Sequence, residues 1–222
     1  MSSTRVDERL TTNTQFERVA PSIVADAQLL STATLHEAAG KIGALPSAIK
    51  PAAKNFRVCG PTVTVISPGG DNLWLHRALY VARPGDVLVV YVSGRYEHGY
   101  WGEVMSTAAK ARGLGGLVID GCVRDGVLLE ALGFPVFARG LCIRGTGKDF
   151  GARGWINAPV LIGDVVVAPG DLICGDGDGV VCVPRGQAAA AAAAARQRDS
   201  HEADVCRQLE QGATTLDLFG WR

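Results

Sequence analysis

The chain has 222 residues, and its 22 basic and 22 acidic side chains give a formal net charge of zero at pH 7. Because there is no excess of positive charge to hold a phosphate backbone, the composition argues against a nucleic-acid-binding protein. Hydrophobic residues make up 47% of the chain, but no apolar run approaches the ~18 residues of a membrane span, so we expect them to fill the core of a single domain.

The N-terminal part is expected to be an arm that leads into helices. Residues 1–20 combine a polar arm with the beginning of a helix, and they lack the apolar segment of a signal peptide, which favours a cytoplasmic protein. A helix is predicted over residues 32–39, with Thr32 or Thr34 near its cap. Strands then alternate with short helices and Pro-Gly turns, as in an α/β fold.

A helix over residues 103–112 is the next clear element, with an expected apolar stripe of Val104, Ala108 and Ala111. The backbone N–H groups of its first turn have no intrahelical acceptors, and the helix macrodipole is positive there. The turn consists of Gly102, Glu103, Val104 and Met105. A carboxylate is therefore a candidate ligand at this helix start. In the structural alternative, Glu103 only complements the dipole and Trp101 is a core residue.

A buried strand is predicted over residues 116–120, followed by a loop through Arg124 and Asp125 and a helix over residues 126–132. Ligands of open α/β sheets gather where strands end in such loops. Arg124 could hold developing negative charge, and Asp125 could bind a divalent metal.

Structural alternatives for both residues stay open at this point. Asp125 stands where the N-cap of the following helix is expected. Arg124 could pair with Asp120 or with Glu130 instead of binding a ligand.

The last third of the chain predicts a tight turn and a long helix. Residues 175–179 (GDGDG) resemble a calcium loop but lack the later glutamate of an EF-hand, so a turn before a strand is the better interpretation. Eight consecutive alanines, residues 188–195, predict one helix from about residue 186 to residue 211. The alanine face allows close approach of another backbone and suits an interface.

Neither histidines nor cysteines form a recognisable metal motif. The four histidines have no zinc-binding spacing, and the six cysteines contain no C-x-x-C. We therefore expect the cysteines to be reduced core residues of a cytoplasmic protein.

The segment W-G-E-x-x-x-x-A-A, from Trp101, and the segment G-x-V-I-D-G-x-x-R-D, ending at Asp125, resemble the signature of a known family. This family contains the 4-hydroxy-4-methyl-2-oxoglutarate aldolases and the RraA-like proteins. Further similar segments are residues 58–65, 70–73, 83–90, 133–140, 169–172 and 176–184. The resemblance implies one α/β domain over residues 1–222, with a central mixed sheet or barrel of the swivelling β/β/α type flanked by helices. Residues 186–222 would form the C-terminal helix and tail at a subunit interface.

The resemblance also implies a reaction. Family enzymes are class II aldolases that split a 4-hydroxy-2-oxo diacid into pyruvate and a second oxo-acid, and they decarboxylate oxaloacetate. Asp125 would be the protein ligand of Mg²⁺ or Mn²⁺, and Arg124 would bind substrate oxygens and favour the alkoxide. The amides of residues 102–105 would hold the pyruvyl carboxylate. No lysine is needed for a Schiff base, which sets Lys110 and Lys148 aside.

One more acid in these enzymes comes from the C-terminal helix of a neighbouring subunit in a homotrimer or hexamer. Counting back from the L-x-x-G-x-x-x-L-D pattern that ends at Asp217 places it at Glu202, through a tail that departs from the family pattern. Alternatively, Glu202 is an exposed helix residue that pairs with Arg198 or Arg207.

A second function of a different class is also implied. RraA-like regulators bind and inhibit a ribonuclease E-type RNA-degrading enzyme without catalysis. A strongly acidic C-terminus would favour the regulator, whereas the chain ends in Leu218-Phe219-Gly220-Trp221-Arg222.

Overall fold

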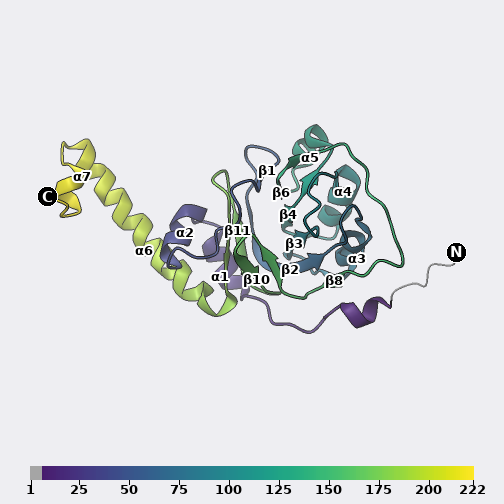
Figure 1. Cartoon of the computed structure of the whole chain (residues 1–222). Helices are drawn as coiled ribbons and strands as arrows, with labels where there is room; N and C mark the ends of the chain where they lie inside the picture. The colour runs from purple at the N-terminus through teal and green to yellow at the C-terminus, as the bar shows by residue number, and fades with distance from the viewer. Residues whose placement is uncertain (1–6) are drawn as a thin grey trace.

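The computed structural model describes residues 7–222, which form one α/β domain with a long C-terminal helix (Figure 1). Residues 1–6 of the expected N-terminal arm lie outside the described residues. The helices are η1 (Glu8–Thr11), α1 (Pro21–Ala27), α2 (Thr32–Ala38), α3 (Leu73–Val81), α4 (Glu103–Ala111), α5 (Gly126–Leu132), α6 (Arg185–Glu210) and α7 (Thr215–Leu218). The predicted α/β class is confirmed.

A mixed sheet forms the centre of the domain, with the strand order β1-β6-β4-β3-β2-β11-β12 and β8 paired to β2. Its strands are β1 (Lys50–Pro51), β2 (Val58–Ile66), β3 (Val87–Tyr91), β4 (Gly116–Asp120), β6 (Val136–Ala138), β8 (Trp155–Ile156), β11 (Leu172–Gly175) and β12 (Val180–Val183). Two further ladders pair β5 (Cys122–Val123) with β7 (Gly140–Leu141) and β9 (Val160–Ile162) with β10 (Val165–Val167).

The sheet is curled, because its two outer ends approach each other. The Lys50 ammonium on β1 donates to the carbonyl oxygen of Asp178, in the turn between β11 and β12. The middle strands β2, β3, β4 and β6 run parallel. Every residue of β4 is buried, and β3 is buried except at its last residue, which explains their continuous apolar sequences. The predicted strand at residues 116–120 is therefore confirmed.

Two groups of helices cover the sheet at opposite ends of the domain (Figure 1). The larger core lies with α3 and α4 and contains Trp74 and Trp101. The second core lies where α1, α2 and α6 pack near β12, and it contains Leu35 and Val183. Along β11 and β12 successive side chains alternate between the two cores, with Leu172, Cys174, Val181 and Val183 in the second core and Ile173, Val180 and Cys182 in the larger one.

The long helix predicted over residues 186–211 is confirmed as α6, within one residue at each end. Its buried alanines are Ala188, Ala191, Ala192 and Ala195, which lie in the second core and face helices of the same chain. The distal half of α6 extends away from the domain and carries α7 at its end (Figure 1).

The helix predicted over residues 32–39 is confirmed as α2, with Thr32 next to its N-cap, Ser31, whose hydroxyl accepts from the backbone N–H of Thr34 at 3.0 Å. One detail of the predicted helices is wrong. The apolar stripe of α4 is displaced: Val104 and Ala111 are exposed, and the buried face consists of Met105, Ser106 and Ala109. Ser106 fits that face because its hydroxyl accepts from the Trp101 indole at 2.6 Å.

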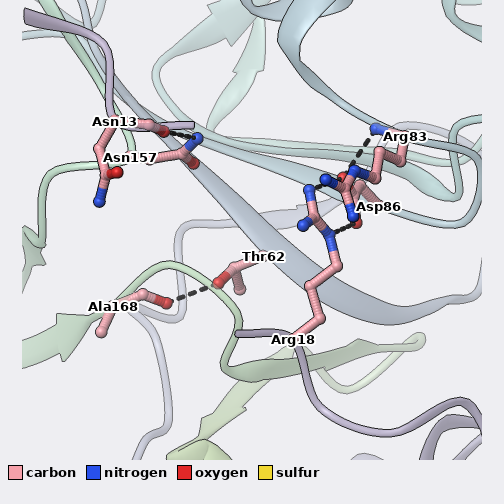
Figure 2. Close-up of polar contacts among 7 residues, drawn as sticks. All are labelled: Asn13, Arg18, Thr62, Arg83, Asp86, Asn157 and Ala168. Atoms are coloured by element: carbon pink, nitrogen blue, oxygen red, sulfur yellow. Dashed lines mark hydrogen bonds and ion pairs between the residues drawn. The ribbon is translucent and has the colours of Figure 1, made fainter. Parts of the chain in front are cut away.

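Polar contacts fasten the N-terminal arm to the sheet (Figure 2). The Arg18 guanidinium donates to both oxygens of Asp86, at 2.7 and 2.8 Å, and the backbone N–H of Arg83 adds a further bond of 2.8 Å. The Asn157 amide donates to the carbonyl oxygen of Asn13 at 2.8 Å.

A separate contact joins β2 to the loop before β11. Thr62 of β2 donates to the carbonyl oxygen of Ala168 at 2.6 Å.

We predict that Arg18→Ala lowers the free energy of unfolding by on the order of 3 kcal/mol, because it leaves a buried carboxylate without its cation. The Asp86 side chain is only 1% exposed. Urea unfolding followed by circular dichroism measures the change. The matched control is Arg9→Ala, which removes the exposed pair with Asp7 and should leave the midpoint unchanged. Equal midpoints for the two variants would contradict the prediction.

Candidate active site

A cleft of about 280 Å³ lies where four segments meet. Asn72 and His76 come from the start of α3, the turn from Tyr100 to Met105 from the start of α4, and Arg124 and Asp125 from the start of α5. The loop with Thr146 and Lys148 forms the remaining wall. The structure thus brings together Arg124, Asp125 and three of the four residues predicted at the helix start. Glu103 is the fourth and does not line the cleft itself.

The start of α4 allows the Asp125 carboxylate to come close to the helix backbone. Gly102 is the N-cap residue, has extended backbone angles, and provides no side-chain cap. The backbone N–H of Glu103 instead donates to Oδ2 of Asp125 at 3.2 Å. A Cβ atom added at Gly102 would overlap Oδ2 of Asp125. Glycine is therefore required at this position so that the Asp125 carboxylate can reach the helix start.

Asp125 occupies the N-cap position of α5 but does not cap that helix through its side chain. Its backbone is left-handed (φ 64°, ψ 37°), a conformation that aspartate tolerates better than most residues. The side chain is directed at α4 instead and remains 34% exposed. The expected N-cap position of Asp125 is therefore confirmed, but its side chain does not cap the helix, and the carboxylate is accessible to a ligand.

Arg124 is also available to a ligand. Its Nε lies 3.7 Å from Oδ2 of Asp125, and its side chain is 50% exposed. The alternative pairing with Asp120 is wrong, because the buried Asp120 carboxylate accepts from Nε of Arg139 at 2.6 Å. A backbone hydrogen bond of 2.9 Å from Arg124 to the carbonyl oxygen of Trp101 fixes this loop against the α4 start.

Sequence reasoning missed Asn72, His76 and Lys148 as parts of the cleft. The Lys148 ammonium donates to the Asn72 side chain at 2.9 Å, and that side chain donates in turn to the carbonyl oxygen of Tyr100 at 2.8 Å. The pKa of His76 is lowered by burial and, second, by the positive charge of Lys148. His76 is therefore uncharged at neutral pH, and Lys148 adds positive charge to the cleft.

Asp71 explains why these residues converge. Its Oδ1 accepts from the backbone N–H of Leu73 at 2.8 Å at the start of α3, and its Oδ2 accepts from Asp149 N–H at 2.6 Å. One buried carboxylate thereby ties the loop that carries Lys148 to α3. The only signal in the sequence was the similarity of residues 70–73 to the family pattern, which named no partner for them.

The donor set of the cleft fits a hard divalent cation that keeps most of its water. Within residues 7–222, no cluster of three or more histidine, cysteine or acidic side chains is arranged to hold a metal. Asp125 is the carboxylate that lines the cleft. Mg²⁺ is commonly held by one or two carboxylates, with water and substrate oxygens as its other ligands.

Glu202 does not reach this cleft within its own chain. It lies on the distal half of α6, half exposed, with its carboxylate 2.8 Å from Nε of Arg198. The predicted role of Glu202 in a neighbouring subunit stays a prediction.

The fold and the cleft define an α/β protein with a candidate site at the carboxyl ends of its parallel strands. A model of the RraA-like family, described as Aldolase/RraA, matches residues 23–182. The chain belongs to the RraA-like family, which confirms the resemblance inferred from its motifs.

Known proteins agree with this assignment. A Halalkalibacterium halodurans protein named "Putative 4-hydroxy-4-methyl-2-oxoglutarate aldolase" is 40% identical over 158 residues, 71% of this chain and 74% of the relative. An uncharacterised Pseudomonas syringae structure has a TM-score of 0.79 at 29% identity, covering 90% of this chain and 93% of the other. A Streptomyces coelicolor structure, described as an unusual member of the RNase ES inhibitor RraA protein family, has a TM-score of 0.75 at 27% identity, covering 86% and 100%.

No helix within residues 7–222 has both the length and the apolar character that crossing a membrane requires.

We predict that Gly102→Ala destabilises the protein by about 1–3 kcal/mol, because the added methyl group displaces the Asp125 carboxylate. The cost should shrink in an Asp125→Gly background, where that carboxylate is gone and the left-handed backbone is relieved. Urea unfolding of the four proteins in this cycle measures the coupling. Gly186→Ala on α6 is the control, since a Cβ there meets nothing within 4 Å. Equal losses in both backgrounds would refute the proposed contact.

Proposed function

We propose that this protein is a divalent-metal-dependent class II aldolase. Its substrate would be a 4-hydroxy-2-oxo diacid, which it would cleave to pyruvate and a second oxo-acid, and it would also decarboxylate oxaloacetate. The observation that carries the proposal is the convergence of Arg124, Asp125 and the α4 start on one cleft. Aldolase names among its relatives support the same class of chemistry.

The α4 start would hold the substrate carboxylate. The Glu103 N–H is used by Asp125, which leaves the amides of Val104 and Met105 as first-turn donors without intrahelical acceptors. Both residues line the cleft, and Lys148 faces the same space. A carboxylate bound there would meet amide dipoles and one positive charge, which orients the rest of the substrate toward Arg124 and Asp125.

Asp125 would hold Mg²⁺ or Mn²⁺ together with water and substrate oxygens. A metal ion bound there supplies Lewis acidity, which stabilises the enolate common to aldol cleavage and oxaloacetate decarboxylation. Arg124 would donate to the substrate oxygen that gains charge as the carbon–carbon bond breaks. Since the Arg124 guanidinium is half exposed in the cleft, it can bind such an oxygen without first breaking a buried ion pair.

A regulatory function is the second candidate. The likeness to a Streptomyces coelicolor member of the RNase ES inhibitor RraA protein family favours it. A regulator needs a surface for its partner enzyme but no turnover, so the two candidates differ in whether oxo-acids are consumed.

We predict that pyruvate release from oxaloacetate and from 4-hydroxy-4-methyl-2-oxoglutarate stops in EDTA and returns with Mg²⁺ or Mn²⁺. Asp125→Ala should also weaken Mn²⁺ binding measured by calorimetry, because it removes the charged oxygen donor of the cleft. Lys148→Ala is the control and should leave Mn²⁺ binding largely unchanged. Full turnover in EDTA, or a borohydride-trapped adduct on Lys148, would overturn the class II assignment. No turnover under any condition would favour the regulator.

The family resemblance also implies a homotrimer or hexamer in which Glu202 completes the site of a neighbour. Arg124→Ala should lower kcat by on the order of 10²-fold or more, as loss of one transition-state donor does.

Mixing inactive Arg124→Ala with inactive Glu202→Ala should restore part of the activity, because hybrid interfaces contain one intact site. Glu210→Ala, on the same helix, is the matched control. A fully active Glu202→Ala protein would return Glu202 to its exposed pairing with Arg198.

A further inference from the structure

Two cysteines outside the candidate active site lie side by side on neighbouring strands of the sheet. Cys59 on β2 lies directly opposite Cys174 on β11, and their sulfur atoms are 3.1 Å apart. All six cysteines are free thiols in this structure. The two thiols line a second cavity, which shares no lining residue with the cleft of Arg124 and Asp125.

The strand register favours a bond between these two residues. Opposite residues of an antiparallel ladder alternate between hydrogen-bonded and non-hydrogen-bonded pairs, and side chains are closer in the latter. Pro61, two residues after Cys59, lies opposite Leu172 and has no N–H with which to form a hydrogen-bonded pair. Cys59 and Cys174 belong to the same class of pair, whose typical Cα separation of ~4.5 Å falls within the range of disulfides.

The second cavity gives small molecules a route to Cys59. It has a volume of about 380 Å³ and is lined by Gln28, Arg57 and both cysteines, among others. Cys59 is partly exposed, whereas Cys174 is buried. The Arg57 guanidinium donates to the carbonyl oxygen of Leu30 at 2.7 Å, which holds a positive charge at the cavity wall. A small polar oxidant therefore meets Cys59 first.

We propose that Cys59 and Cys174 form a reversible two-electron thiol–disulfide site that is oxidised by hydroperoxides entering this cavity. The Cys59 sulfur attacks the terminal peroxide oxygen and becomes a sulfenic acid, while the O–O bond breaks and the leaving oxygen takes the Cys59 proton and departs as alcohol or water. The Cys174 sulfur then attacks the Cys59 sulfur, the S–O bond breaks, and the released hydroxide takes the Cys174 proton to form water. Two thiols and one hydroperoxide give one disulfide, one water and one alcohol.

The surroundings assign different roles to the two thiols. The contact with Cys59 and, next, burial raise the pKa of the Cys174 thiol, which makes it the less reactive of the two thiols toward a peroxide. Its position 3.1 Å from the Cys59 sulfur places it for the second, resolving step. Cys182 is near in sequence but does not compete, because it lies opposite Ile173 on the neighbouring strand and thus points to the other face of the sheet. Cys182 belongs to the larger core, while Cys174 belongs to the second one.

The test uses the full chain with Cys206→Ser, which removes an exposed thiol. After treatment with hydrogen peroxide, peptide mapping should show a Cys59–Cys174 cross-link that dithiothreitol reverses. The two residues are 115 positions apart, so the bond closes a long loop, and the oxidised protein should melt higher by roughly 5–10 °C. A cross-link between other cysteines, or an unmodified Cys59, would overturn the proposal.

Two further variants separate the steps. Cys174→Ser should accumulate the Cys59 sulfenic acid, captured by dimedone, and should show no rise in melting temperature. Cys142→Ser is the matched control and should behave like the parent. Cys142 does not line the second cavity, and the thiol with which it interacts is Cys122. If Cys174→Ser does not fold, the mapped cross-link of the parent still decides the matter. Dimedone capture on the parent without any disulfide would also refute the pairing.

Discussion

The contact between the Asp125 carboxylate and the start of α4 is the constraint on which the candidate site depends. It joins Asp125, which directly precedes α5, to the backbone N–H of Glu103, the first residue of α4. The contact exists only because Gly102 has no side chain. The left-handed backbone of Asp125 turns its side chain away from its own helix. A left-handed aspartate, a missing Cβ and an amide without an intrahelical acceptor therefore act together, and none of them alone would identify a site.

The position of this contact follows from the sheet. β2, β3 and β4 are adjacent and parallel, so their carboxyl ends lie at one edge, where ligands of α/β proteins commonly bind. Asn72 comes after β2, Gly102 after β3, and Arg124 and Asp125 after β4. Three separate stretches of sequence converge because three strands end together. The Asp71 carboxylate then adds the loop with Lys148, which comes from much later in the chain.

Sequence patterns predicted the elements of this region better than their contacts. The strand of residues 116–120, the helix of residues 126–132 and the long α6 were all identifiable, because periodicity and glycine ends are local signals. The buried face of α4 could not be predicted in this way. Val104 borders the cleft and is exposed, while Ser106 is buried, with its hydroxyl hydrogen-bonded to Trp101. The partnership of Asn72 with Lys148 spans 76 positions, and no local pattern encodes such a contact.

The alanine tract of α6 has a consequence for how the distal helix is oriented. Identical small residues fill the contact of α6 with α1 and α2. The alanines themselves therefore do little to fix the register of α6 against these two helices. Register is specified at the ends, where Asp171 accepts from the Arg185 amide at 2.9 Å and Arg196 pairs with Asp26 at 2.7 Å. A change of tract length by one codon would preserve helicity and composition. It would nevertheless impose a screw displacement of about 100° and 1.5 Å on everything beyond the tract, so that Glu202 would face a different direction.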